Sequence, residues 1–327
     1  MKKILSLVLA ILMLASIASL AGCGAKETLK FGLGVDANST KITSATDEAD
    51  GIGQATATVA AVLVDKDGKI VKCVIDTADN KVTFTKDGKA NTAETFKTKY
   101  ELGENYGMKA YGGAKKEWFE QVDAFTALIV GKTTDEIKAL VAGENKGTDE
   151  VINAGCTIMI NEFVNAVVKA IENAKESEAT ADDTLKLGIV SSQSGAKDAT
   201  ADAAGANGFE TSIAASVVNA DKKVVANVID SVSFTVAFDA NGATETKTAA
   251  IDSKRQLGEN YGMKAYGGAK LEWFEQADAL STVCAGKTAS EISALEAAEG
   301  KGTTDVINAG CTIAISDMVK AVALSAN

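Results

Sequence analysis

Two short segments place a threonine hydroxyl two residues after a glycine, an arrangement that could bind or carry a phosphate group. Residues 151–158 read VINAGCTI, and the same letters recur 155 positions later. Each segment leads into an expected terminal helix, and the free N–H groups and dipole of a helix N-terminus favour a phosphate. The candidate residues are Gly155 and Thr157 in the first segment and Gly310 and Thr312 in the second. The alternative is a buried strand or tight turn in which Cys156 and Cys311 are small core residues.

A second duplicated segment is rich in glycine and carries aromatic and basic side chains. Residues 102–115 read LGENYGMKAYGGAK, and residues 257–270 are identical. Its tyrosines could stack on a planar ligand, and Lys109 or Lys264 could contact a phosphate. The glycine spacing matches neither a P-loop nor a Rossmann fingerprint. The alternative is a packed surface loop that positions the helix expected after it.

The amino-acid composition excludes several kinds of chemistry. The chain has no histidine, so Ser-His-Asp catalysis and His-ligated zinc are ruled out. Arg255 is the only arginine, which nearly excludes paired arginine clamps on phosphate. The net charge is −11, from 33 basic and 44 acidic residues, so we expect no nucleic-acid partner. No carboxylate spacing indicates acid–base catalysis, and no metal site is indicated.

The cysteines and the aromatic residues are better explained by packing than by chemistry. Only Cys156 and Cys311 correspond between the two halves, and no C-x-x-C motif is present. We therefore expect free, buried thiols rather than a shared disulfide. The apolar residues at helical spacing around Trp118 indicate a core helix, and Glu117 and Glu120 are expected on its solvated face.

The duplicated segments indicate that one unit occurs twice in tandem. Both pairs of segments are 155 residues apart, and weaker matches continue toward the N-terminus. We predict two domains, residues 28–177 and 178–327, with the boundary in the polar stretch 175–180. Two copies of this length are too few and too long for a solenoid.

Each unit is predicted to have a strand-rich first half and a helical second half. The expected strands are residues 56–64, 70–76 and 81–85 in the first unit, and 211–219, 224–230 and 232–238 in the second. Turn residues such as Asp-Gly separate them, as in hairpins. Helices are expected from Trp118 to a stop at Gly131, after capping boxes at 133–136 and 288–291, and over 160–174 and 316–324. The fold class predicted is α+β, in two tandem copies of an antiparallel β-sheet unit with helices packed on one side.

The N-terminus resembles that of a bacterial lipoprotein. Lys2 and Lys3 precede an uncharged apolar run that ends in Leu-Ala-Gly followed by Cys23. A basic start, an apolar stretch and small residues are typical of a signal peptide, here residues 1–22. The resemblance implies lipidation of Cys23, with residues 23–27 as a short tether. We expect the protein on the outer face of the bacterial cytoplasmic membrane, held to membrane lipid through Cys23.

Each unit also resembles the FMN-binding domain of flavin-carrying surface lipoproteins and of ion-translocating electron-transfer complexes. In that family a motif of roughly Asp-x-x-Ser-Gly-Ala-Thr carries FMN through a phosphoester on the threonine, attached by a separate transferase. The matching stretches here are Ala154-Gly155-Cys156-Thr157 and Ala309-Gly310-Cys311-Thr312. Alanine stands where the family has serine, and cysteine where it has alanine.

This resemblance implies an electron carrier. Covalent FMN on Thr157 and Thr312 would perform the chemistry, with electrons exchanged with a membrane redox partner. The alternative is a surface binding or structural module without a cofactor, as the altered motif and the few aromatic residues would favour. A solute-binding lipoprotein is a third, weaker fit, because the two lobes of such proteins usually differ. We expect an electron carrier or binding module rather than a turnover enzyme.

Overall fold

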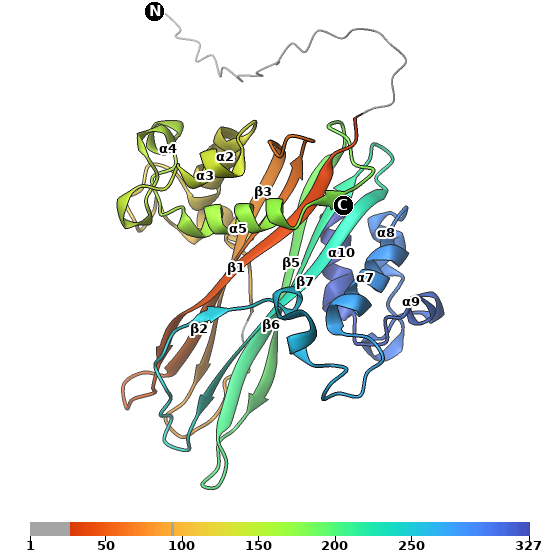
Figure 1. Ribbon diagram of the computed structural model, residues 1–327. Helices are drawn as coiled ribbons and strands as arrows, with labels where there is room; N and C mark the ends of the chain where they lie inside the picture. The colour runs from red at the N-terminus through yellow and green to blue at the C-terminus, as the bar shows by residue number, and fades with distance from the viewer. Residues whose placement is uncertain (1–26, 93–94) are drawn as a thin grey trace, which may run out of the picture.

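The computed structural model describes residues 27–92 and 95–327 and contains two antiparallel sheets with helices outside them (Figure 1). One sheet has the strand order β3-β2-β1-β4, with β8 also paired to β1, and the other has the order β5-β6-β7. The strands are β1 (Lys30–Thr43), β2 (Gly51–Val64), β3 (Ile70–Phe84), β4 (Lys175–Glu176), β5 (Thr184–Lys197), β6 (Gly205–Val218), β7 (Val224–Phe238) and β8 (Ala250–Ile251). The predicted signal peptide and Cys23 lie outside the described residues.

The helices follow the third long strand of each sheet, in the same order both times. The first set is α1 (Lys99–Leu102), η1 (Gly103–Tyr106), α2 (Trp118–Ile129), α3 (Thr134–Lys138), η2 (Gly143–Asn145), α4 (Asp149–Ala154) and α5 (Asn161–Glu172). The second set is α6 (Lys254–Leu257), η3 (Gly258–Tyr261), α7 (Trp273–Cys284), α8 (Ala289–Ser293), η4 (Ala298–Gly300), α9 (Thr304–Ala309) and α10 (Ser316–Ser325). The predicted α+β class is confirmed.

The predicted hairpins form through side chains that close their turns. Strands β2 and β3 pair from Gly51 with Phe84 to Val64 with Ile70. In the turn between them, the Asp65 carboxylate accepts N–H bonds from Asp67 and Lys69, both at 2.9 Å. An aspartate side chain that accepts hydrogen bonds from the N–H groups two and four residues later in the chain stabilises such a turn. The second unit uses an asparagine, Asn219, in the same way.

Several strand predictions need correction. Residues 70–76 and 81–84 belong to one continuous strand, β3, which ends one residue before the predicted 81–85 strand does, and residues 224–230 and 232–238 belong to β7. The strands β1 and β5 are not apparent from the sequence pattern. The polar stretch 175–180 is more than a connection, because β4 pairs with the start of β1.

The protein is built in four layers, helices, sheet, sheet and helices. The outer face of the first sheet packs against α2 to α5, and the outer face of the second packs against α7 to α10. The inner faces of the two sheets pack on each other and share one core, which includes Phe31, Val59, Ile213 and Val217. Beyond the helices the sheets continue as long hairpins (Figure 1), and a second shared cluster that includes Phe84 and Phe238 lies between them.

Glycines allow the last helix of each unit to lie directly on its sheet. A Cβ atom at Gly34 in β1 would stand 2.1 Å from the carbonyl oxygen of Ala166 in α5. A Cβ at Gly188 in β5 would stand 2.0 Å from the carbonyl oxygen of Ala321 in α10. Such distances leave no space for any side chain, so these positions require glycine.

The contacts between the two units are reciprocal. The Ala45 N–H donates to the Gly242 carbonyl at 2.8 Å, and the Ala199 N–H donates to the Gly88 carbonyl at 2.7 Å. Phe84 and its counterpart Phe238 stack with ring centroids 4.2 Å apart and planes 3° from parallel. When residue i of one half contacts j of the other and the reverse also holds, an approximate twofold axis relates the halves. The chain therefore folds like a dimer of two similar units.

Candidate functional site

The two duplicated segments meet at a buried glutamine in each unit. The Oε1 atom of Gln121 accepts hydrogen bonds from the N–H of Thr157 at 2.8 Å and from its Oγ1 at 3.0 Å. The Nε2 atom of Gln121 donates to the Lys116 carbonyl at 3.2 Å. Only 1% of the Gln121 side chain is exposed. One side chain therefore joins the glycine-rich loop, helix α2 and the threonine.

The second unit repeats this arrangement. Gln276 accepts from the N–H of Thr312 at 2.9 Å and from its Oγ1 at 3.1 Å, and donates to the Leu271 carbonyl at 3.2 Å. Gln121 and Gln276 do not stand out in the sequence, because glutamine has no motif of its own. Their one signal is that both lie in the longer repeated stretch EWFEQ.

The threonines are presented at the surface by a turn. Gly155 ends α4 with φ at 106°, and Gly310 ends α9 with φ at 113°, a backbone conformation that favours glycine. Thr157 and Thr312 follow two residues later, and both are exposed. The residues before each glycine form the short helices α4 and α9, not the strand considered as an alternative from the sequence. Thr157 precedes α5 by four residues, so its closest polar partner is Gln121 rather than the start of that helix.

The cysteines between glycine and threonine are core residues, as predicted. Cys156 and Cys311 are fully buried, and the four cysteines in the described part of the chain are free thiols. Burial raises the thiol pKa of Cys156 and of Cys311 to about 11. A thiol with so high a pKa carries little thiolate at neutral pH and is a poor nucleophile. The threonine hydroxyl is therefore the accessible reactive group of this segment.

The glycine-rich loop is fixed in place by a carboxylate. Glu117 precedes α2, is almost fully buried, and accepts N–H bonds from Met108 at 2.9 Å and Lys109 at 3.1 Å. The expectation that Glu117 lies on a solvated face is therefore wrong. The ammonium of Lys109 pairs with Glu120 at 3.2 Å, so this lysine is already engaged. The ring of Tyr111 is 91% exposed at the tip of the loop.

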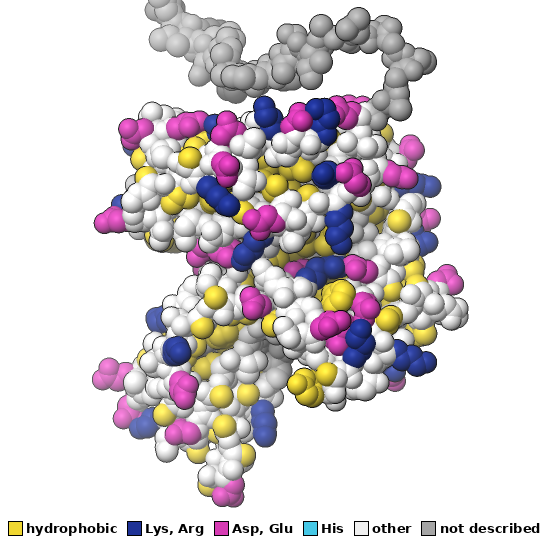
Figure 2. Space-filling view, viewed as in Figure 1, with side chains coloured by type: hydrophobic (Ala, Val, Ile, Leu, Met, Phe, Trp, Pro, Cys, Tyr) yellow, Lys and Arg dark blue, Asp and Glu magenta, His cyan; other side chains and the backbone are white. Residues whose placement is uncertain are grey.

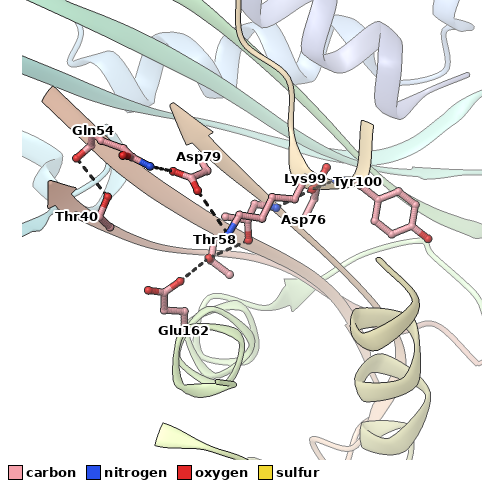
Figure 3. A network of polar contacts seen from close by, with 9 residues as sticks. Thr40, Gln54, Thr58, Asp76, Asp79, Lys99, Tyr100 and Glu162 are labelled. Carbon is pink, nitrogen blue, oxygen red and sulfur yellow. Dashed lines mark hydrogen bonds and ion pairs between the residues drawn. The ribbon is translucent and has the colours of Figure 1, made fainter. Parts of the chain in front are cut away.

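A partly buried lysine, Lys99, anchors the same loop to the sheet (Figure 3). The Nζ atom of Lys99 lies 5.2 Å from the centroid of Tyr106 and 5.9 Å from that of Trp118, and it pairs with Asp79 at 3.7 Å. Asp79 in turn accepts from Gln54 on β2 at 2.7 Å. A cation held between two aromatic rings and a carboxylate is well stabilised away from water. In the second unit Lys254 occupies the same position.

Lys254 lies between the equivalent aromatic rings but is more deeply buried than Lys99 and pairs with a different carboxylate. It lies 5.2 Å from the centroid of Tyr261 and 5.3 Å from that of Trp273, and pairs with Glu210 on β6 at 2.7 Å. Trp118 and Trp273 are thus core residues, as predicted. The two lysines are absent from the sequence-based candidates, because only the tertiary fold brings them between the rings.

The residues around each threonine fit a covalently attached phosphoester. Each threonine is exposed, and its hydroxyl and its backbone N–H are held by a buried glutamine. In the first unit a Cβ at Gly155 would stand 2.1 Å from the Nζ atom of Lys116, so the ammonium lies directly over the glycine. A lysine ammonium is a common partner of phosphate. This site would leave an attached flavin ring outside the protein core.

A separate cleft lies between the two units. It has a volume of about 700 Å³ and is bordered by β1, the end of α5, β7, α6 and α7. Arg255 lines it and pairs with Asp278. Two buried polar atoms on its wall, Nδ2 of Asn227 and Oγ of Ser281, have no hydrogen-bond partner among residues 27–92 and 95–327. A volume of this size suits a small ligand.

Acidic and basic side chains are interspersed over the face shown in Figure 2, which is indented between the first unit's helices and the free ends of the long strands. Within the described ranges, no helix is long and apolar enough to span a membrane.

Comparisons with known proteins give limited information. No protein-family model matches the chain, and no solved structure matches it. A protein of Desulfitobacterium hafniense named chlorophenol reductase is 32% identical over 128 residues, which cover 35% of this chain. The match spans 38% of the length of that relative. The similarity is therefore to part of a protein whose name denotes a reductase.

Proposed function

We propose that the protein is a lipid-anchored electron carrier on the outer face of the cytoplasmic membrane, with FMN attached through a phosphoester to Thr157 and Thr312. The observation that carries this proposal is the pair of exposed threonines, whose hydroxyls are each held by a buried glutamine at the junction of the two duplicated segments. The similarity to a protein named as a reductase supports a redox role.

In this proposal the protein's own residues hold the FMN in position, and the redox chemistry is that of the flavin. When bound, the flavin supplies one- and two-electron transfer. Gln121 and Gln276 fix the backbone of the attachment residues, and the rigid glycine-rich loops hold Tyr111 and Tyr266 at the surface. Exposed attachment favours exchange of electrons with another protein. A lipid on Cys23 would keep both sites close to a membrane redox partner.

The test is to produce the full chain together with a transferase that attaches FMN, and to record the visible spectrum and the intact mass. We expect a flavin band and an added mass for one or two phosphoesters. Thr157→Ala combined with Thr312→Ala should remove both signals. Thr40→Ala, which changes an exposed threonine on β1, is the matched control and should remain yellow. A double variant that stays fully yellow would show that the attachment positions are wrong.

The cleft between the units favours a second candidate, a binding module for a small polar ligand. The unpartnered atoms of Asn227 and Ser281 need hydrogen-bond partners, and an unsatisfied buried polar group costs about 1–3 kcal/mol. A ligand that fills the cleft should raise the melting temperature of the wild-type protein but not of Asn227→Leu. A panel of free amino acids and small carboxylic acids is the first set to test. No shift with any of them would weigh against this second function.

A further inference from the structure

The two threonine sites differ at one position that touches the glycine. Within residues 102–121 and 151–158 and their counterparts, the one difference is that Lys116 in the first unit corresponds to Leu271 in the second. The Lys116 ammonium covers Gly155, at 2.1 Å from the place of a Cβ atom. At Gly310 the nearest atom is Cδ1 of Leu271, at 3.0 Å. A cation and a methyl group therefore lie over equivalent glycines, each of which stands two residues before the attachment threonine.

The charge of the Lys116 ammonium reaches the Glu120 carboxyl and helps to lower its pKa, but Glu120 forms its ion pair with Lys109. Lys116 itself forms no ion pair with any residue in the described parts of the chain, although its side chain is partly buried. Its charge acts on the site, since it lowers the pKa of the Cys156 thiol against the larger effect of burial. An unpaired, partly desolvated cation gains free energy when an anion comes within contact distance.

We propose that Lys116 makes Thr157 the preferred acceptor of the phosphoester and pairs with its phosphate, whereas Leu271 leaves Thr312 the slower and less occupied site. This inference rests on the proposed function. Attachment requires a flavin nucleotide with a pyrophosphate bond as the donor. The bond from Oγ1 to phosphorus forms while the pyrophosphate P–O bond breaks, the nucleoside monophosphate leaves, and the hydroxyl proton passes to a base. No oxidation or reduction is involved.

The charge of Lys116 favours attachment of the phosphate in the first unit. The attached group is a phosphodiester with one negative charge, which the single charge of Lys116 neutralises. Apolar Leu271 offers the same phosphate no hydrogen bond. The preceding lysines, Lys115 and Lys270, are both exposed and present in both units, so they do not distinguish the sites. Within residues 102–121 and 151–158, position 116 therefore carries the difference between the two sites.

The experiment measures occupancy rather than activity. The full chain is produced with the transferase under limiting flavin supply and digested, and mass spectrometry gives the fraction of each threonine peptide that carries FMN. For a partly exposed pair we expect Thr157 to be roughly two- to fivefold more occupied than Thr312. Lys116→Leu should lower the occupancy of Thr157 to that of Thr312, and the exchange variant Lys116→Leu with Leu271→Lys should reverse the order.

Lys115→Leu removes the same charge without the contact on Gly155 and is the matched control, expected to leave the order unchanged. Equal occupancy in the wild type, or an exchange variant that keeps the wild-type order, would overturn the inference but leave the proposed function standing. FMN on neither peptide, with a transferase that is active on another acceptor, would overturn both. Melting curves of each variant show whether the fold is retained.

Discussion

At the scale of residues, the site depends on a few buried polar groups whose partners are all in place. Gln121 satisfies two donors of Thr157 and one carbonyl of the loop. Glu117 satisfies two further N–H groups of the same loop. A loop that contains many glycines loses much conformational entropy when it becomes ordered, so it needs such contacts. Stability and site geometry are therefore coupled through the same side chains.

Replacement of Gln121 by leucine should destabilise the protein by about 1–3 kcal/mol, because buried donors and an acceptor lose their partners. Urea unfolding measures the change in the free energy of unfolding. Thr157→Val removes one hydroxyl but keeps the N–H bond to Gln121, and should cost under about 1 kcal/mol. Equal losses in the two variants would contradict the role given to Gln121.

Asp76 on β3 gives the protein a pH-dependent stability. Burial raises the carboxyl pKa of Asp76 from 3.8 to about 6, although Thr77 and Tyr100 donate N–H bonds to it. The folded state therefore binds this proton more tightly than the unfolded chain does. Its contribution to stability is fully present below pH 3.8 and is lost as the pH rises through 6.

Asp76→Asn stays neutral and should lose this dependence. Relative to the wild type, the variant should gain on the order of 2 kcal/mol between pH 4 and pH 7. Urea unfolding at a series of pH values measures it. Asp202→Asn, at an exposed position, is the control and should follow the wild-type profile. A constant difference between Asp76→Asn and the wild type across that range would refute the assignment.

At the scale of elements, each unit depends on how closely its last helix approaches the sheet. Gly34→Ala should destabilise the protein by about 1–3 kcal/mol or more, because α5 must move away from β1. Gly188→Ala should act in the same way on α10 and β5. Gly143→Ala, where an added Cβ meets no atom within 4 Å, is the matched control. The melting temperature of each variant tests this packing. Equal melting temperatures for Gly34→Ala, Gly188→Ala and the control would be inconsistent with it.

The sequence predicts the helices better than the strands, for a physical reason. Helix α2 has apolar residues at helical spacing, and the box from Thr133 to Glu136 caps α3 as expected. Strand β1 reads KFGLGVDANSTKIT, in which the glycines required by α5 and a polar second half hide the strand pattern. Strand β3 contains the mostly polar stretch 76–80, which resembles a turn in the sequence. This stretch carries Asp76 and Asp79, and Asp79 pairs with Lys99 (Figure 3).

The candidate site is only partly visible in the sequence. Thr157, Gly155 and the glycine-rich loop can be identified because they are duplicated. Gln121 and Lys99 act through contacts between residues tens of positions apart, and no local pattern marks such contacts. The cleft between the units cannot be predicted at all from a single unit, since it exists only after the two sheets have packed together.

At the scale of the whole molecule, the two units share their core and should unfold together. Phe84 and Phe238 are both buried and stack across the approximate twofold axis. Phe84→Ala should cost about 3–5 kcal/mol and lower the single melting transition of both units. Differential scanning calorimetry of the full chain measures it. Two separate transitions, with only one affected by the substitution, would show that the units are independent.

The reciprocal arrangement also has an evolutionary consequence. In an assembly of two identical chains, every substitution appears twice, so a change that harms one side of the axis harms the other as well. Here both sides belong to one chain, and each can change alone. The pairs Tyr100 with Arg255 and Lys116 with Leu271 are such one-sided changes. One side can therefore acquire a new specificity while its counterpart preserves the original one.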